Sequence, residues 1–258
     1  MRKFIIEDHH LIAPFNEPAR DLSILNKPLK IHQADVLDEA IGPTPVELAL
    51  ESIHDLPSFA PEGGEIVVYR DNLYFDIEFF REFFDQARAS RLPSRAVLPA
   101  DDAAWMKYAI PVSRLQPVED IHGRPLYYPL DLWYFPNGYV SEQHWRDIPI
   151  YSDYKEKGYY NVPDSMSNLR PGGADGEPSR DLDLTHLLTE RSCLSIDSWV
   201  HVYFANIILG VFSRGSRFEE YLARHNLFAL TVLFRAILEQ KQVISCSKLV
   251  QVGEGTII

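Results

Sequence analysis

Strands and helices leave different spacings of apolar residues, and both spacings occur in this chain. Residues 66–69 read Ile-Val-Val-Tyr, a consecutive apolar run that is typical of a strand covered on both faces. Residues 4–6 and 95–98 predict two further short strands. Over residues 77–89 the apolar positions recur at intervals of three and four, which predicts an amphipathic helix. Strands that alternate with helices indicate an α/β protein whose sheet is at least partly parallel.

The other predicted elements are shorter or have a less regular pattern of apolar residues. Three prolines rule out a regular helix between residues 11 and 29. Residues 151–183 include the run Pro-Gly-Gly-Ala-Asp-Gly-Glu-Pro and predict a loop-rich surface insertion. Asp76 and the Asp101-Asp102 pair precede predicted helices, and we expect them to act as caps. The remaining predictions are helices over residues 31–40, 45–53, 103–108, 199–212 (buried) and 217–240 (amphipathic), and a strand over residues 124–135.

Length and charge narrow the class of protein. A chain of 258 residues suits one large domain, or one domain with an appendage. Its formal net charge of −12 repels phosphate backbones and anionic lipid, which excludes a general role in binding nucleic acid or membranes. The longest apolar run, residues 199–212, is short of the roughly 20 residues that span a bilayer. The N-terminus lacks the apolar segment of a signal peptide, so we expect a cytoplasmic protein.

Two segments carry a resemblance to a known family. Residues 14–29 read Pro-Phe-Asn-Glu-Pro-Ala-Arg-Asp-Leu-Ser-Ile-Leu-Asn-Lys-Pro-Leu, and residues 68–75 read Val-Tyr-Arg-Asp-Asn-Leu-Tyr-Phe before a predicted helix. In this order they resemble sugar-1-phosphate nucleotidyltransferases, in particular the thymidylyltransferase-like branch. The resemblance implies a Rossmann-like mixed sheet flanked by helices, as in nucleotide-diphospho-sugar transferases. It also implies a sugar phosphate or nucleotide as ligand, and Mg²⁺ as cofactor.

The resemblance assigns roles to individual residues. Asp71, at the end of the 66–69 strand, matches the family's metal-binding aspartate, although an aspartate there also suits a turn cap. Arg20 and Lys27 match the region that supplies catalytic cations, but each is equally compatible with a surface ion pair. Asn72 lies beside the metal position and is a candidate for ligand binding. Asn206 interrupts an apolar run. Two alternatives are open for it: a buried amide whose hydrogen bonds are satisfied by its neighbours, or a residue that lines a pocket.

Several departures from the family pattern predict that catalysis is lost. Residues 7–12 read Glu-Asp-His-His-Leu-Ile where the family has a glycine-rich phosphate loop. Ala19 replaces the family's lysine, and Arg70 replaces its glycine and could neutralise Asp71. No second metal carboxylate is evident from the C-terminal half. We therefore favour a degenerate nucleotidyltransferase-like binding module, with an active Mg-dependent transferase and a structural or interaction domain as the alternatives.

Two further features complete the sequence predictions. Residues 252–258 read Val-Gly-Glu-Gly-Thr-Ile-Ile and resemble the first coil of a hexapeptide-repeat left-handed β-helix. We therefore expect a nucleotidyltransferase-like domain over residues 1–248 and the start of a β-helix over 249–258, before an acyltransferase-type domain that would form homo-oligomers. Adjacent histidines, His9 and His10, point in different directions on an extended chain and show no partner at helical spacing, so we assign them no metal.

Overall fold

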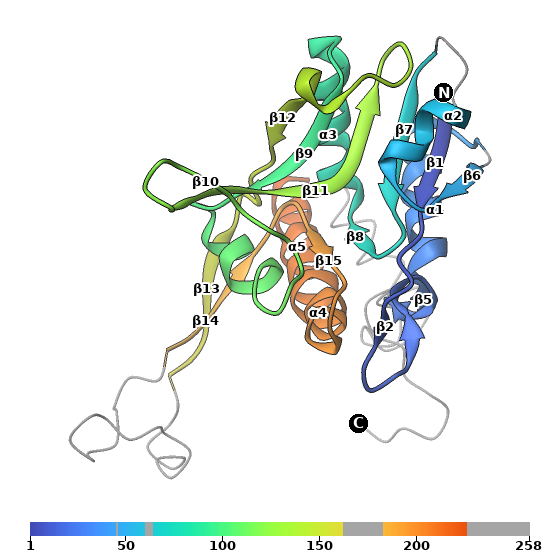
Figure 1. Ribbon diagram of the computed structural model, residues 1–258. Helices are drawn as coiled ribbons and strands as arrows, with labels where there is room; N and C mark the ends of the chain where they lie inside the picture. Colours follow the sequence, from blue (N-terminus) through green and yellow to red (C-terminus); the bar gives the residue numbers. More distant parts are fainter. Residues whose placement is uncertain (45, 60–63, 162–182, 226–258) are drawn as a thin grey trace.

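The computed structural model describes residues 1–258 except 45, 60–63, 162–182 and 226–258. A seven-stranded mixed sheet forms its centre, in the order β12-β9-β11-β7-β1-β6 with β10 paired to β11 (Figure 1). These results confirm the prediction of a mixed α/β sheet flanked by helices. The sheet strands are β1 (Arg2–Ile6), β6 (Val46–Leu50), β7 (Ile66–Arg70), β9 (Ser94–Pro99), β10 (Val118–Glu119), β11 (Pro125–Phe135) and β12 (Arg146–Pro149).

The N-terminal part of the sheet is parallel, as the sequence predicts. β1 pairs in parallel with both β6 and β7, whereas β11 runs antiparallel to β7 and β9. Parallel strands end at the same edge of a sheet, so the residues that follow β1, β6 and β7 come together there. In open α/β sheets this edge is where ligands bind.

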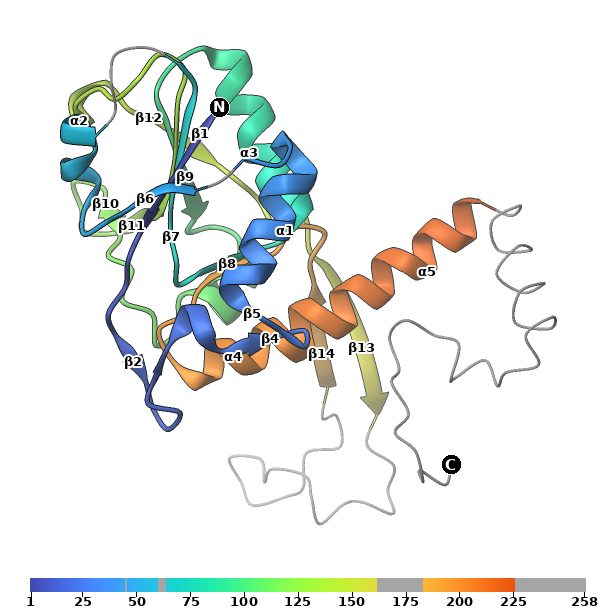
Figure 2. The ribbon, with the colours of Figure 1, turned by 90° about the vertical axis from the view of Figure 1, so that its right-hand side faces the viewer.

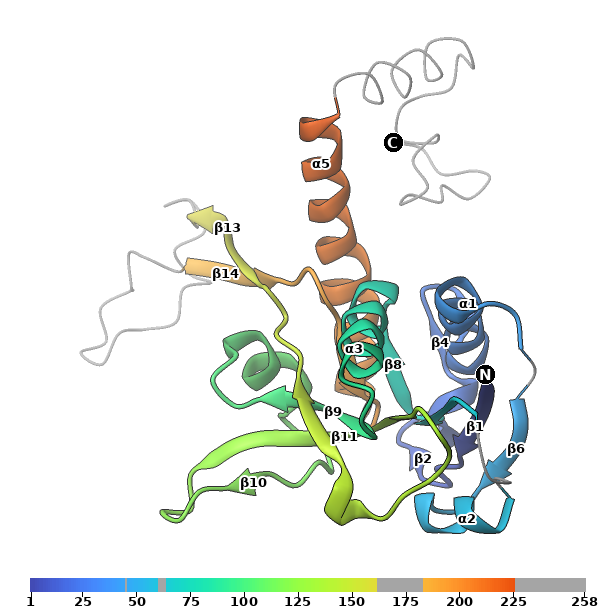
Figure 3. The same ribbon diagram turned by 90° about the horizontal axis from the view of Figure 1, so that it is seen from above.

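Side chains of the central strands alternate between two apolar cores. Ile66 and Val68 of β7 lie in one core, while Val67 and Tyr69 lie in the other. Helices α1 (Leu29–Ile41) and α3 (Ile77–Ser90) cover the Val67 side (Figures 2 and 3). The opposite core includes residues of a 3-10 turn and of the short helix α2 (Leu56–Phe59). A strand buried on both faces is therefore confirmed at residues 66–69.

Both predicted helix caps are present. The Asp76 side chain accepts a hydrogen bond from the Phe79 amide at 2.9 Å, at the start of α3. Asp102 accepts from the amides of Ala104 and Trp105 at 2.9 and 3.2 Å. A π-helical segment, Trp105–Ala109, follows this second cap. Short carboxylates stabilise these helix starts because they satisfy amides that have no partner within the helix.

The helix predicted over residues 45–53 is wrong. Val46–Leu50 forms strand β6, and a 3-10 turn follows at Ile53–Asp55. Parallel pairing with β1 satisfies the backbone groups of this segment, so tertiary pairing overrides a weak local helix pattern. The proline-bearing stretch before α1 forms two small hairpins, β2 (Leu11–Ile12) with β3 (Glu17–Pro18) and β4 (Ser23–Ile24) with β5 (Lys27–Pro28).

The segment predicted as a loop-rich insertion, residues 151–183, contains strand structure where it is described. Its two ends pair as antiparallel strands, β13 (Lys155–Asn161) and β14 (Asp183–Leu188), which extend away from the sheet in Figure 1. Residues 162–182 lie outside the described part of the chain. Strand β8 (Leu73–Phe75) pairs with β15 (Cys193–Ser195), and this pairing brings the C-terminal half of the chain next to the end of β7.

The helical run after β15 is less buried than its apolar composition predicts. It consists of α4 (Trp199–Phe204), a π-helical segment (Ala205–Ser213) and α5 (Arg214–Arg224). Trp199 is 54% exposed and Tyr203 is 50% exposed, because only one side of the run packs against the body. The rest of the predicted 217–240 helix and the predicted β-helix coil lie outside the described residues. None of the helices that the structure describes is long and apolar enough to cross a membrane.

Candidate functional site

Asp71 lies at the sheet edge where the sequence places it, directly after β7. Its backbone amide donates to the Ile6 carbonyl at 3.0 Å, which extends the parallel pairing of β1 and β7 by one residue. Asp71 and Asn72 are 3% and 2% exposed. The chain then turns into β8, so both polar side chains are held between two stretches of regular structure.

Both carboxylate oxygens of Asp71 already have donors. The Asp8 backbone amide donates to Oδ1 at 2.8 Å, and Arg20 Nη1 donates to Oδ2 at 3.2 Å. Burial raises the pKa of the Asp71 carboxyl, although the Asp8 amide and the Arg20 guanidinium both act to lower it. The Asp71 carboxylate is therefore buried at a cost in free energy, and it is paired with Arg20 of the same chain.

Arg20 reaches Asp71 from the 3-10 turn at Ala19–Asp21. The same Nη1 donates to Glu7 at 2.7 Å, and this hydrogen bond is the main cause of a raised pKa for Arg20. The structure thus joins two residues that sequence reasoning had singled out separately. The expectation that Arg70 neutralises Asp71 is wrong, because Arg70 forms an ion pair with Asp131 on the neighbouring strand β11.

This arrangement does not fit a magnesium ion at Asp71. Mg²⁺ requires near-octahedral oxygen ligands, several of them water. At Asp71 an amide and a guanidinium take the two carboxylate oxygens, and a bound cation would lie against the positive charge of Arg20.

Arg114 joins two further carboxylates at the same edge. It forms an ion pair with Asp8 through Nη2, and its Nε donates to Asp197 Oδ1 at 2.7 Å. The Arg114 backbone amide also donates to Asp197 Oδ2 at 3.0 Å. Burial acts to raise the pKa of Asp197, but the hydrogen bonds and the charge of Arg114 outweigh it, so the net shift is downward.

Asn72 and His201 complete the surroundings of Asp197. Asn72 Nδ2 donates to Ser195 Oγ and to Asp197 Oδ1, both at 3.1 Å. The Asp197 amide donates to His201 Nδ1 at 3.1 Å, which leaves the ring proton on Nε2 to donate to the Pro111 carbonyl at 2.9 Å. Burial lowers the pKa of His201, so the ring is a neutral structural support for this loop.

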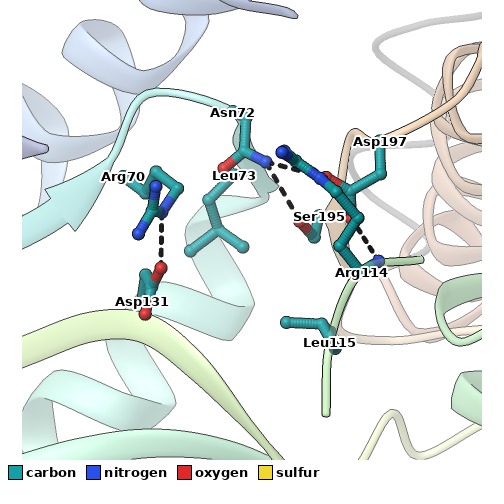
Figure 4. Close-up of a pocket in the computed structure, with 8 residues that line it drawn as sticks. All are labelled: Arg70, Asn72, Leu73, Arg114, Leu115, Asp131, Ser195 and Asp197. Atoms are coloured by element: carbon teal, nitrogen blue, oxygen red, sulfur yellow. Dashed lines mark hydrogen bonds and ion pairs between the residues drawn. The ribbon is translucent and has the colours of Figure 1, made fainter. Parts of the chain in front are cut away.

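A pocket of about 220 Å³ opens between these groups. Arg70 with Asp131 forms one wall and Arg114 with Asp197 forms the other, with Asn72 between them (Figure 4). Two guanidiniums face two carboxylates, so the formal charges of the walls balance. The lining residues are Arg70, Asn72, Leu73, Arg114, Leu115, Asp131, Ser195 and Asp197.

Of the predicted site residues, Asn72 lines this pocket, Asp71 and Arg20 lie beside it in the ion pair described above, and Lys27 and Asn206 lie elsewhere. Lys27 Nζ forms an exposed ion pair with Asp35 at 2.5 Å. Asn206 Oδ1 accepts from the Leu25 amide at 2.8 Å, and its Nδ2 donates to the Val202 carbonyl at 2.8 Å. Asn206 therefore fastens the β4/β5 hairpin to the helical run as a partly buried amide whose hydrogen bonds are satisfied.

Sequence reasoning missed most of the pocket lining. Arg114, Asp131 and Asp197 belong to segments without a recognisable motif, and the search for a carboxylate from the C-terminal half found none. Asp197 is such a carboxylate, delivered by the return of the chain through β15. The available signal was the run Ser-Ile-Asp-Ser at 195–198, polar residues between an apolar strand and a helix start.

No protein-family model matches the chain, and no curated protein matches it at a significant level. Among solved structures, UDP-glucose pyrophosphorylase with UDP-glucose aligns with a TM-score of 0.42 and 8% identity over 80% of this chain and 97% of that one. The apo form of a UDP-glucose pyrophosphorylase gives 0.41 and 8% over the same shares. A provisionally assigned glucose-1-phosphate thymidylyltransferase from Bacillus anthracis, solved with sucrose, gives 0.34 and 11% over 52% and 71%.

Proposed function

We propose that this chain is a nucleotidyltransferase-like module that binds a sugar phosphate or nucleotide at the Arg70–Arg114 pocket without transferring a nucleotidyl group. The observation that carries the proposal is the ion pair between Arg20 and Asp71. The position that matches the family's metal aspartate is filled by a cation of the protein itself. The sequence resemblance supports the ligand class, and the position at the carboxyl ends of parallel strands supports the place of binding.

The pocket suits a hydroxyl-rich ligand better than a highly charged one. Asn72 and Ser195 contribute an amide and a hydroxyl, and the paired charges of the walls offer both donors and acceptors. Sugar hydroxyls donate and accept, so they match this mixture without adding net charge. We therefore assign the sugar part of the ligand to the pocket.

The charges around Asp71 oppose a triphosphate. Phosphoryl transfer depends on cations and amides placed around the phosphates. Four carboxylates at this edge share two guanidiniums, Arg20 and Arg114, among the residues that the structure describes; these carboxylates are Glu7, Asp8, Asp71 and Asp197. The residual negative charge repels the γ-phosphate that a nucleotidyl donor brings.

Calorimetric titration tests the proposal. We expect saturable binding of a sugar 1-phosphate or nucleotide sugar, with the same affinity in Mg²⁺ and in EDTA. Ser195→Ala removes a pocket hydroxyl and should weaken binding severalfold, since a single hydrogen bond contributes about 0.5–1.5 kcal/mol. Lys27→Ala is the control: the sequence resemblance also assigns Lys27 to the site, but it lies outside the pocket lining, so the affinity should not change. Failure of every sugar phosphate and nucleotide to bind would refute the proposal.

An active Mg-dependent sugar-1-phosphate nucleotidyltransferase is the second candidate. One observation favours it: Asp71 and Asp197, two buried carboxylates, both reach this edge of the sheet. Displacement of Arg20 and Arg114 by substrate would free both for metal. Pyrophosphate release that is lost in Asp71→Ala identifies this candidate.

We also propose that this chain supports a following β-helix domain, which residues 252–258 predict. Such a domain would form a homo-oligomer, with a trimer expected from the family resemblance. Light scattering on the full-length protein tests this part. A monomer over a wide range of concentration would contradict it.

A further inference from the structure

Glu7, His9 and Glu51 gather at the sheet edge, beside the Arg20–Asp71 pair. His9 Nε2 lies 3.1 Å from Glu51 Oε2 and 3.4 Å from Oε1. One ligand atom from each of the three residues lies within 4.8 Å of the others. His9 and Glu51 are exposed, and Glu7 is partly buried. All three side chains can ligate a metal; because Arg20 Nη1 donates to Glu7 Oε1 at 2.7 Å, Glu7 would bind the ion through Oε2.

The sheet topology brings the three residues together. Glu7 directly follows β1, and Glu51 directly follows β6, the parallel neighbour of β1. The Glu7 amide donates to the Leu50 carbonyl at 2.9 Å, so the pairing of the two strands continues to the residues that precede the cluster. His9 is two residues beyond Glu7 on the same loop. The backbone that carries the cluster is thus fixed by the central sheet.

We propose that Glu7, His9 and Glu51 form an open binding site for a Zn²⁺-like divalent transition-metal ion. Two carboxylates and one imidazole form the donor set that such ions accept. At metal–ligand distances near 2.0 Å, neighbouring ligand atoms of a tetrahedral site are about 3.3 Å apart. The His9–Glu51 separation of 3.1 Å is already close to that value. Water would complete the coordination, and the exposure of His9 and Glu51 leaves a path for the ion.

Local charge also favours a cation at this place. Glu51 joins Glu7, Asp8, Asp71 and Asp197 at an edge where Arg20 and Arg114 supply the positive charge. A divalent ion would offset this excess of negative charge. Imidazole selects for ions such as Zn²⁺ over Mg²⁺, which prefers oxygen ligands and keeps its water. This site is therefore distinct, in residues and in metal, from the magnesium site that the sequence predicts at Asp71.

The sequence alone does not indicate His9 as a metal ligand, because His9 has no partner at helical spacing. The partner is Glu51, 42 residues further along the chain, and the parallel strand pair supplies the contact. His10 next to it supplies a natural contrast, since it is absent from the cluster. His54 supplies another: its Nε2 lies 3.7 Å from Glu142, and within the described part of the chain it belongs to no such group of three.

Titration of tag-free protein with Zn²⁺ tests the site. We expect one Zn²⁺ per chain in the tightest phase, with affinity weakened more than about tenfold in His9→Ala and in Glu51→Gln, because each variant removes a direct ligand. His10→Ala and His54→Ala are the matched controls and should stay within about twofold of the wild type. Glu7 is left unchanged because Arg20 also depends on it. Circular dichroism checks that the exposed substitutions leave the fold intact.

The outcomes separate this proposal from general binding by surface histidines. Equal losses in His9→Ala and His10→Ala would overturn it, as would wild-type affinity in Glu51→Gln. An absence of saturable Zn²⁺ binding would overturn it as well. Zn²⁺ binding is measured without any sugar or nucleotide, so its result is independent of the proposed function.

Discussion

At the residue scale, the pKa values of two buried carboxyl groups at the site are shifted in opposite directions. Burial raises the pKa of Asp71, while the hydrogen bonds of Arg114 overcome burial and lower the pKa of Asp197. The difference follows from the donors. Asp197 accepts hydrogen bonds from the amide and Nε of Arg114 and also from Asn72. Asp71 accepts from the Asp8 amide and from Arg20, and the nearby Asp8 carboxylate acts to raise its pKa. Opposite shifts predict opposite pH dependences of stability.

Asp71→Asn tests the first shift. A carboxyl with a pKa raised above 3.8 contributes stability that is fully present below pH 3.8 and is lost as pH rises through the folded-state pKa. Asparagine has no such dependence. The free energy of unfolding of the variant minus that of the wild type should therefore increase as pH rises above 3.8 and then level off. Urea unfolding over this range measures it. A difference that decreases as pH rises would show that the ion pair outweighs burial.

Asp197→Asn should show the reverse dependence. A carboxyl with a pKa lowered below 3.8 contributes stability that is present above pH 3.8 and is lost as pH falls through the folded-state pKa. At neutral pH we expect a loss of about 1–3 kcal/mol, because Arg114 loses a buried charged partner. The loss should shrink at acid pH. Asp35→Asn, in an exposed pair with Lys27, is the control and should cost less than about 1 kcal/mol.

At the scale of elements, the contact between the C-terminal helical run and the β4/β5 hairpin depends on one glycine. A Cβ at Gly210 would overlap the Leu25 side chain and lie 2.5 Å from the Ala205 carbonyl oxygen. A Cβ at Gly215, in α5, would meet nothing within 4 Å. Substitutions at these two glycines therefore distinguish the effect of close packing on stability from the effect of helix propensity.

Alanine at the two positions should change stability with opposite signs. Gly215→Ala should stabilise the protein by about 0.5–1 kcal/mol, because alanine is the better helix former. Gly210→Ala should destabilise it by about 1–3 kcal/mol, because overpacking outweighs the same gain. Thermal or urea unfolding of both variants measures the pair. A stabilised Gly210→Ala would contradict the packing between this helix and Leu25.

The elements that sequence could predict are those with a strong period of their own. The β7 strand and the α3 helix are clear because apolar residues repeat over most of their length. The β6 strand is not, because its structure comes from pairing with β1 rather than from its own pattern. The same holds for β13 and β14, whose structure comes from their pairing with each other.

At the scale of the whole molecule, the site is assembled from segments that are far apart in sequence. Asp71 and Arg20 were predictable because they lie in short stretches that resemble a family. Arg114 and Asp197 were not, since 83 residues separate them and only the completed fold brings them together. Residues 20–72 therefore give the position of the site, and Arg114, Asp131 and Asp197 give its balance of charge.

The Arg20–Asp71 pair underlies the account of a binding module without nucleotidyl transfer, and a pyrophosphate-release assay tests it most directly. The protein is incubated with Mg²⁺, the nucleoside triphosphates and the sugar 1-phosphate that binds in calorimetry. The account predicts no pyrophosphate above the level without protein, for the wild type and for Asp71→Ala alike. Pyrophosphate released by the wild type and abolished in Asp71→Ala would contradict it.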